Sequence, residues 1–417
     1  MNTPNRWLPA AAGVLMQIAF GAVYAWSVFR IPLSHAHGWT IAEVTAAFEI
    51  AIFVVGFAAF AGGLWMKRSG PRPVALAGAV LYGLGTMLTG MAHSLTALYL
   101  TYGVIGGAGL GLGYIVPIAT LVRWFPDKRG MITGLAVAGF GAGALVTAPM
   151  AESLIASVGV GRTFEVLGLA YLVVVFACAL TMQNPPEGYA PAGYNPAVSQ
   201  SGRSTRDFTL RQALGTWQWY ALWLTLFLNT TAGIAIISQA SPMAQEISGV
   251  SAAAAAGMVG LISIANGSGR FLWAWFSDAV GRRAVFLMMF LLQSAAFLLL
   301  SQVHRFSLLS LLAFVILLCY GGGFGTMPAF ATDYFGAGQI GSIYGMMLTA
   351  WGFAAVFGPS LVAEIRQATG HYQGAMRWLA LATLVSTLVP LLLRPPRERQ
   401  SRDFRVEGVG TPSRVRP

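Results

Sequence analysis

The sequence predicts an all-α membrane protein, with twelve transmembrane helices arranged as two bundles of six. Three observations carry this prediction: an apolar composition, twelve apolar windows of helical length, and an internal repeat that relates the two halves. Of the 417 residues, 56% are hydrophobic and only 9% are charged. A soluble domain carries roughly 25% charged residues because its surface faces water. Most of this chain must therefore face lipid, which argues against a cytosolic enzyme or a nucleic-acid-binding protein.

Twelve segments are long and apolar enough to cross a bilayer, which takes about 20 residues of helix. In the first half they are Trp7–Phe29, Ile41–Trp65, Val74–Met91, Leu95–Val122, Met131–Ser153 and Phe164–Met182. In the second half they are Trp217–Ile237, Ala252–Trp275, Ala284–Val303, Ser307–Ala331, Gly341–Ile365 and Ala375–Leu393. Charge, Gly or Pro marks the breaks between segments, as in KRSGPR at 67–72 and PDKRG at 126–130. Most connections are short, so we expect consecutive helices to be antiparallel neighbours.

The longest interruption, residues 183–214, is rich in Pro, Gly, Ser and charge. It contains NPPEGYAPAGYNP and SQSGRSTRDF, a composition that cannot bury a core and that is typical of a flexible linker. The predicted domains are therefore an N-terminal bundle at 1–182, a cytoplasmic linker at 183–214, a C-terminal bundle at 215–393 and a cytoplasmic tail at 394–417.

The two halves repeat each other. The loop GLWMKRSGPR at 63–72 corresponds to AWFSDAVGRR at 274–283, and further landmarks recur at the same spacing of 211 residues. The matched pairs are Gly70 and Gly281, Pro117 and Pro328, Gly134 and Gly345, and Gly141 and Gly352. Internal duplication is typical of secondary transporters, whose substrate site lies near the bilayer midplane where the halves meet.

The positive charges predict the orientation of the chain. With both termini in the cytoplasm, 19 of the 25 Lys and Arg residues fall in inner segments and five fall in outer ones. This asymmetry follows the positive-inside rule, and it accounts for the net charge of +11 without a nucleic-acid partner. One basic residue, Arg270, fits neither group.

Arg270 lies inside the eighth predicted helix, in ISIANGSGRFLWAWF. A lone guanidinium there costs at least about 2.5–3.5 kcal/mol. We interpret it as a cation that faces a cavity between the halves and binds an anion, because a planar guanidinium can donate two parallel hydrogen bonds to a carboxylate. A structural ion pair or snorkelling toward the inner face is the alternative. Asn266, one turn earlier, shares its helix face and is expected to orient the guanidinium or to contact substrate.

Glu49 is a second ionisable residue within a predicted span. One hypothesis makes it a proton-coupling carboxylate whose pKa is raised by burial. The alternative places it in water near the outer mouth, or in a pair with Arg30. The two cysteines, Cys178 and Cys319, lie in apolar runs and suit neither a disulfide framework nor a metal site. We expect no metal and no cofactor.

Several longer motifs resemble the major facilitator superfamily, and in particular its oxalate/formate antiporter branch with the bacterial relatives of monocarboxylate transporters. The motifs are GAVYAWSVFRIPL at 21–33, RWFPDKRGMITGLAVAGFGAG at 123–143, NPPEGY at 184–189 and ANGSGRFLWAWFSDAVGR at 265–282. The resemblance implies two six-helix bundles that rock around a central site for small carboxylates. It also implies that Arg270 is the substrate-binding arginine, and that aromatic cavity positions are occupied by Tyr24, Tyr114, Tyr320 and Phe324.

Two departures from the family pattern bear on the substrate. Where the oxalate antiporter has a lysine in its eleventh helix, this sequence has Trp351, so one cation remains to bind one carboxylate. This favours a monocarboxylate such as lactate, pyruvate or formate over oxalate. Where the animal transporters have an aspartate implicated in proton coupling, this sequence has Asn266, which cannot titrate.

The sequence thus predicts a multi-pass protein of the inner cell membrane, surrounded by lipid and monomeric, that moves a small monocarboxylate by alternating access. Proton symport and exchange both stay open as coupling modes. The alternatives are an oxalate/formate-type dicarboxylate antiporter and an exporter of an unrelated solute. A membrane enzyme is disfavoured because no convergent set of nucleophiles, acids and bases is apparent. A carboxylate sensor on the same fold is disfavoured because the tail is short.

Overall fold

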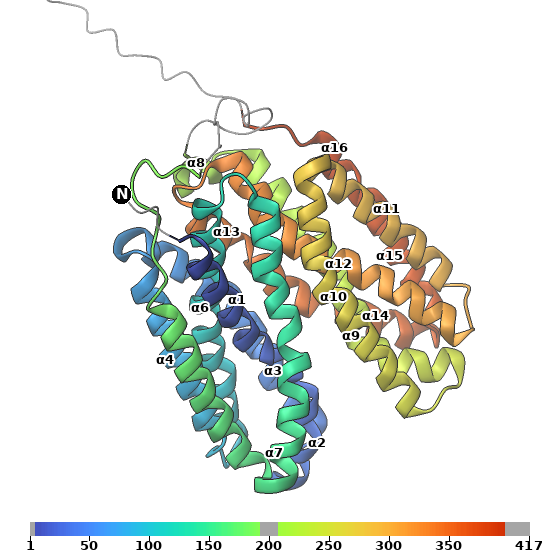
Figure 1. Ribbon diagram of the computed structural model, residues 1–417. Helices are drawn as coiled ribbons and strands as arrows, with labels where there is room; N and C mark the ends of the chain where they lie inside the picture. Colours follow the sequence, from blue (N-terminus) through green and yellow to red (C-terminus); the bar gives the residue numbers. More distant parts are fainter. Residues whose placement is uncertain (1–4, 192–206, 397–417) are drawn as a thin grey trace, which may run out of the picture.

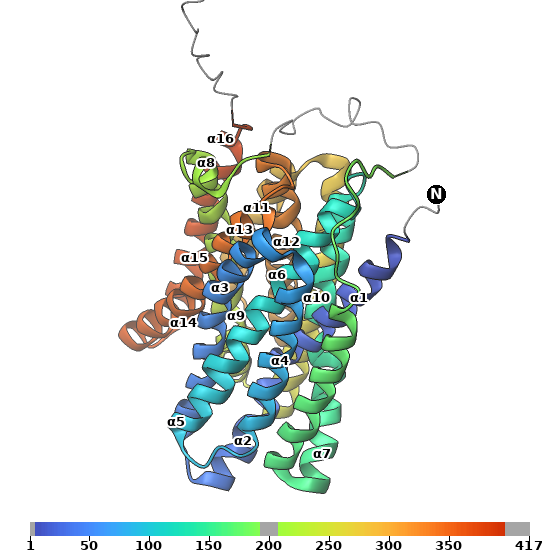
Figure 2. The same ribbon diagram turned by 90° about the vertical axis from the view of Figure 1, so that its left-hand side faces the viewer.

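The computed structural model describes residues 5–191 and 207–396, and within these ranges the chain forms helices joined by short connections. The helices form two groups (Figures 1 and 2). The first group holds α1 (Trp7–Gly21), η1 (Ala22–Ala25), α2 (Trp26–His37), α3 (Ile41–Ser69), α4 (Pro71–Thr89), α5 (Leu95–Leu98), η2 (Tyr99–Gly106), α6 (Gly107–Trp124) and α7 (Arg129–Ala179). The second holds α9 (Trp217–Ser248), α10 (Ala252–Val280), α11 (Arg282–Leu300), α12 (Phe306–Phe335), α13 (Ile340–Met347), α14 (Thr349–Thr369), α15 (Gln373–Ser386) and α16 (Leu388–Leu392).

All twelve predicted spans are helical in the structure. Nine helical segments of the described residues are long and apolar enough by composition to cross a membrane. One of the nine is α7, which contains the fifth and sixth predicted spans; the helix direction changes at Gly159, whose φ of 80° and ψ of 165° are not helical. The third and eighth predicted spans are α4 and α10, which lie outside the nine.

Side chains on the outside of the bundles are apolar. Large hydrophobic residues stay exposed along the helices, among them Leu311, Trp378 and Leu392. A soluble protein does not expose contiguous apolar surface on this scale, whereas hydrocarbon chains solvate it at no cost. The exposed surface therefore agrees with a protein embedded in lipid.

The repeated loop has the same backbone geometry in both halves. Gly70 joins α3 to α4 with a φ of 76°, and its repeat mate Gly281 joins α10 to α11 with a φ of 90°. Side-chain-bearing residues rarely adopt positive φ values, so glycine is needed at both corners. The 211-residue repeat is thus also a repeat of local structure.

The two bundles meet mainly where α7 contacts α10 and α12 and where α3 contacts α13 and α14, and small residues let their backbones come close. A Cβ at Gly141 of α7 would lie 2.6 Å from the Cα of Gly267 in α10, and one at Gly134 would lie 2.8 Å from the carbonyl oxygen of Arg270. Across the other contact, a Cβ at Gly63 of α3 would overlap the carbonyl group of Gly341. Packing by small residues is the usual way in which membrane helices approach each other closely.

Glycine also fixes the backbone around Arg270 within its own bundle. A Cβ at Gly325 of α12 would overlap the carbonyl oxygen of Arg270. We therefore expect Gly325→Ala to lower stability by about 1–3 kcal/mol through overpacking, seen as a lower melting temperature of the purified protein. Gly257→Ala in α10 is the matched control, because nothing lies within 4 Å of its position. Equal melting temperatures for the two variants would contradict the close helix contact.

The predicted linker is helical at one end and packed at both. A short helix, α8 (Leu210–Leu214), follows a capping box formed by Thr209 and Gln212. At the other end, the indole N–H of Trp124 donates to the carbonyl oxygen of Gln183 at 2.8 Å. The composition of the whole linker did not predict α8, because a capping box is recognised from four consecutive residues and not from average composition. Residues 192–206 of the predicted linker and residues 397–417 of the predicted tail lie outside the described residues.

Candidate functional site

Arg270 is fully buried at the interface of the two bundles. Its Nε donates to the Oδ1 atom of Asn266 at 3.2 Å, as the spacing of one helical turn predicts. Its Nη2 donates to the Tyr24 hydroxyl in the other bundle at 3.4 Å, which is long for a hydrogen bond. Its Nη1 has no hydrogen-bond partner, and no carboxylate in the described ranges 5–191 and 207–396 forms an ion pair with this arginine.

Two aromatic rings lie close to the guanidinium. The Cζ atom of Arg270 lies 5.0 Å from the ring centroid of Phe324 and 5.4 Å from that of Phe140. Phe324 belongs to α12 of the second bundle and Phe140 to α7 of the first. Aromatic faces attract a cation by their quadrupole, and more strongly where water is excluded. The rings hold the charged plane in place but give it no hydrogen-bond acceptor.

Trp351 in α14 lies at the centre of the aromatic cluster. It is 1% exposed, and its ring centroid lies 5.1–6.5 Å from four other rings. Those rings belong to Tyr24, Tyr114, Phe140 and Phe324. The first three come from the N-terminal bundle, so this tryptophan joins the two halves of the site. The sequence prediction had placed Trp351 at the position of a second cation, and the structure puts an apolar ring within the same cluster as Arg270.

Three tyrosine hydroxyls near Arg270 are buried without a hydrogen bond of good geometry among the described residues, although they lie close to one another, to Arg270 or to Tyr24. They belong to Tyr114 in α6, Tyr320 in α12 and Tyr344 in α13. All three side chains are fully buried and interact electrostatically with the guanidinium. Burying a polar group without a partner costs about 1–3 kcal/mol. Several such groups around one cation indicate a site built for a polar molecule with acceptor atoms.

The structure thus brings together seven of the eight predicted site residues. They are Arg270, Asn266, Tyr24, Tyr114, Tyr320, Phe324 and Trp351. Glu49 is the exception: it lies on the exposed side of α3 and forms no hydrogen bond or ion pair with Arg30 or with any other described residue. Its proposed role in proton coupling stays a prediction.

Two residues of the site were missed by the sequence analysis. Phe140 lies within the motif at 123–143 without being a candidate site residue, and Tyr344 is not among the candidates either. The repeat contained the signal for Phe140, because the spacing of 211 residues pairs it with Trp351. No comparable signal pointed to Tyr344, whose place in the site follows from the start of α13 at Ile340.

A second interface between the bundles lies at the end of the molecule where α1 begins, here called the terminal face. The α7 N-terminus meets Asp278, whose carboxylate accepts from the backbone N–H of Gly130 at 3.0 Å and of Met131 at 2.7 Å. Asp333 of α12 accepts from Arg129 of α7 at 3.0 Å. We call this cross-bundle contact, comprising Arg129, Gly130 and Met131 against Asp278 and Asp333, the terminal seam.

Charge is balanced within the terminal seam. Arg282 donates to Asp333 at 2.9 Å and to Asp278 at 2.7 Å, and it also donates to the Ser277 hydroxyl. Desolvation opposes the charge of Arg282, and the two carboxylates offset this cost. The negative carboxylate of Asp278 also lies at the positive end of the α7 dipole. The seam therefore holds the two bundles together at the terminal face.

Two helical bundles with a charged and aromatic cluster buried between them are typical of secondary membrane transporters. The chain belongs to the Major Facilitator Superfamily, whose family profile matches residues 11–272 and 222–415. This establishes the fold of twelve spans in two bundles that the sequence predicted.

Individual relatives are similar over most of their length. The chain is 28% identical to the oxalate:formate antiporter of Oxalobacter formigenes over 364 residues, covering 87% of this chain and 85% of that one. It is 27% identical to monocarboxylate transporter 13 of Rattus norvegicus over 358 residues, covering 85% and 81%. Among solved structures, the human organic anion transporter MFSD10 superposes with a TM-score of 0.74 at 15% identity, covering 93% of this chain and 100% of that one. The last similarity concerns the fold alone.

Proposed function

We propose that this protein is a secondary active transporter of small monocarboxylates such as lactate, pyruvate or formate. The observation that carries the proposal is Arg270, which is buried between the bundles, forms no ion pair with a described carboxylate, and has tyrosine hydroxyls around it. A carboxylate placed beside Arg270 accepts from Nη1, which has no other partner, and competes for Nη2 with the long bond to Tyr24. Two parallel bonds of this kind suit the planar guanidinium.

The single positive charge among the site residues favours a substrate with one carboxylate group. Arg270 is the one basic side chain among the site residues described above, and Trp351 adds an apolar surface beside it. A second carboxylate against this ring would lose its hydration without an opposite charge, which costs several kcal/mol. The similarity to an oxalate:formate antiporter keeps a dicarboxylate as the second candidate.

The tyrosines support a substrate with an oxygen atom next to the carboxylate. The hydroxyls of Tyr114, Tyr320 and Tyr344 each donate one hydrogen bond, and a hydroxyl or keto oxygen on the substrate accepts one. The rings of Phe140, Phe324 and Trp351 then enclose the apolar remainder of the molecule. Lactate and pyruvate have this combination of groups, and formate has the carboxylate alone.

Alternating access requires that the bundles separate at each end in turn. We assign the terminal face to the cytoplasmic side of the inner cell membrane. The predicted topology gives this side 19 of the 25 basic residues. The terminal seam then closes the inner side in the described conformation. Proton symport and carboxylate exchange are both compatible with this cycle.

Uptake of labelled lactate into proteoliposomes tests the proposal. We expect saturable uptake that pyruvate inhibits strongly, whereas lactamide, which has the same shape without the charge, does not inhibit. Oxalate should compete about tenfold less well than pyruvate, since each uncompensated buried charge costs more than 1.4 kcal/mol. Equal competition by lactamide would remove the carboxylate assignment, and stronger competition by oxalate would favour the second candidate.

The same vesicles separate the two coupling modes. An imposed pH gradient accelerates uptake if protons travel with the carboxylate, whereas unlabelled substrate inside the vesicles accelerates it if the protein exchanges carboxylates. The control is Glu49→Gln, which removes a charge from the exposed side of α3 and leaves the aromatic cluster unchanged. A gradient effect that survives in Glu49→Gln would show that this carboxylate is not the coupling group.

A further inference from the structure

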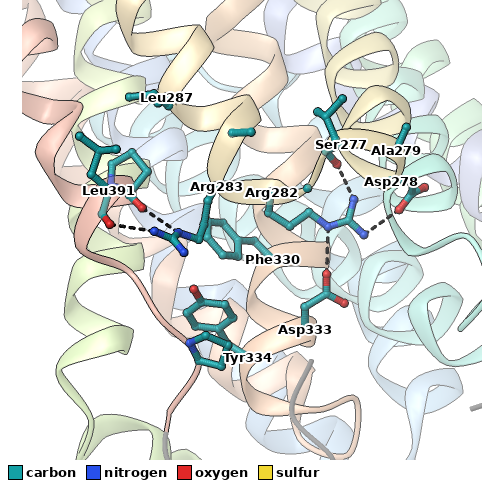
Figure 3. A pocket seen from close by; sticks show the side chains of 15 residues that line it. Ser277, Asp278, Ala279, Arg282, Arg283, Leu287, Phe330, Asp333, Tyr334 and Leu391 are labelled. Carbon is teal, nitrogen blue, oxygen red and sulfur yellow. Dashed lines mark hydrogen bonds and ion pairs between the residues drawn. The ribbon is translucent and has the colours of Figure 1, made fainter. Parts of the chain in front are cut away.

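A cavity of about 650 Å³ lies at the terminal face, away from Arg270 and entirely within the C-terminal bundle (Figure 3). The ends of α10 and α12, the beginning of α11, and the chain from α16 to Pro395 form its walls. Its volume is within the range of small-molecule sites, roughly 300–1,000 Å³. None of the residues that surround Arg270 lines it.

Arg283 supplies a positive charge to this cavity. Its Nε donates to the carbonyl oxygen of Pro390 at 3.0 Å, and its Nη2 donates to that of Leu391 at 2.8 Å. These bonds fix the guanidinium in position without neutralising it. Within the part of the chain that the structure describes, no carboxylate pairs with Arg283 and its Nη1 makes no hydrogen bond.

A second donor lies beside this guanidinium. Tyr334 is 3% exposed, and its hydroxyl is buried without a partner among the described residues. Figure 3 shows the hydroxyl of Tyr334 directed toward the guanidinium of Arg283 at the wall of the cavity. An unsatisfied buried hydroxyl costs about 1–3 kcal/mol unless a ligand supplies its partner.

The N-terminus of α11 adds a third favourable element. This helix runs for 19 residues from Arg282, and no side chain caps it, because its N-cap position is Gly281. The free N–H groups and the positive end of the helix dipole attract anions. The neighbouring carboxylates, Asp278 and Asp333, are already engaged by Arg282, so they leave the charge of Arg283 uncompensated.

The other half of the lining is apolar and leads to the lipid-facing surface. Leu287 and Phe330 form the floor, and Leu391 is 51% exposed at the edge. Next to this edge, Leu388 and Leu392 are among the most exposed apolar side chains. A ligand that fills the cavity therefore has an anionic head for the donors and a hydrocarbon part that continues into the bilayer.

We propose that this cavity binds the phosphate headgroup of an anionic phospholipid from the leaflet nearest the terminal face. The phosphate oxygens accept from Arg283, from the Tyr334 hydroxyl and from the N-terminus of α11, and the acyl chains lie along Leu391 and the exposed leucines of α16. The proposal is independent of the transported substrate, because the two sites share no residue.

Native mass spectrometry of the purified protein tests this site directly. The protein is equilibrated with phosphatidylglycerol or with phosphatidylcholine, and the bound fraction is measured as lipid is titrated. We expect phosphatidylglycerol to bind more tightly, and Arg283→Gln and Tyr334→Phe each to weaken that binding about tenfold, as for the loss of a hydrogen bond to a charged group. Arg305→Gln, which removes an exposed arginine outside the cavity lining, is the charge-matched control and should bind as the wild type does.

Two results would overturn the proposal. One is equal lipid binding by Tyr334→Phe, Arg305→Gln and the wild type, since Tyr334→Phe removes only a hydroxyl and leaves the packing of α12 intact. The other is displacement of the bound lipid by inorganic phosphate or glycerol phosphate at millimolar concentration, which would make the ligand a soluble phosphate. Lactate uptake is not a readout here, so failure of the proposed transport function leaves the test unchanged.

Discussion

Replacement of Arg270 by alanine should abolish carboxylate uptake. The guanidinium is the single charge that the site offers to a carboxylate, and losing one partner of a buried, hydrogen-bonded charge pair costs about 2–5 kcal/mol, or at least about thirtyfold in affinity. Arg270→Lys should also fail, because an ammonium group cannot donate two parallel bonds from the position between Phe140 and Phe324. The measurement is initial uptake of labelled lactate and pyruvate into proteoliposomes, normalised to inserted protein.

The melting temperature of a protein with a substitution at Arg270 distinguishes a transport role of this residue from a structural one. Arg270→Met keeps the length of the side chain and removes a buried charge that no described carboxylate pairs with. We therefore expect the melting temperature of Arg270→Met in the absence of substrate to equal or exceed that of the wild type, while uptake is lost. A transport-active Arg270→Ala would refute the assignment. A lower melting temperature for Arg270→Met would mean that the arginine mainly stabilises the fold.

Replacement of Asp333 by asparagine should destabilise the closed terminal seam more than any other single change there. Its carboxylate is 6% exposed and accepts from Arg129 across the bundles and from Arg282 within its own bundle. Removing the negative charge takes a partner from the buried Arg282 and from the partly buried Arg129, which costs about 3–5 kcal/mol. The bundles should then separate at the terminal face in a larger fraction of molecules, and the melting temperature should fall.

Spin labels report the separation of the bundles directly. Lys128→Cys and Ala279→Cys place labels on exposed positions at either side of the seam, and the native cysteines are buried. We expect Asp333→Asn to lengthen the distance between the labels. Glu246→Gln is the matched control, because Glu246 pairs with Arg366 at an exposed place within one bundle, where an ion pair contributes about 0–1 kcal/mol. Equal distance distributions for both variants would show that Asp333 does not hold the seam closed.

The architecture could be predicted from the sequence because membrane helices must satisfy their backbone hydrogen bonds internally. This constraint turns each long apolar segment into a helix, and the repeat then relates the two bundles. Departures from regular helices could not be predicted in the same way. The π-helical segment η2 and the non-helical Gly159 inside α7 depend on neighbouring helices, which the local sequence does not report.

The sequence predicts those site residues whose burial in a membrane helix carries a large free-energy cost. Arg270 stood out because a charge inside a span is expensive, and Asn266 followed from helical spacing. Aromatic residues carry no such signal, since most of them pack against lipid or other helices. Phe140 could be found only through its repeat mate Trp351, and Tyr344 only through the position of α13 against the site.

The glycine contacts between the bundles have a mechanical consequence. At Gly63, Gly134 and Gly141 the closest approaches between the two halves are to main-chain atoms and to the Cβ atom of Ala274. Glycine-lined surfaces can separate and reassociate with few changes of side-chain rotamer. The conformational entropy cost at the bundle interface is therefore small in each transport cycle. A bulky residue at one of these three positions would keep the two bundles apart. We expect it to slow the reassociation of the bundles in the transport cycle more than it lowers the affinity for substrate.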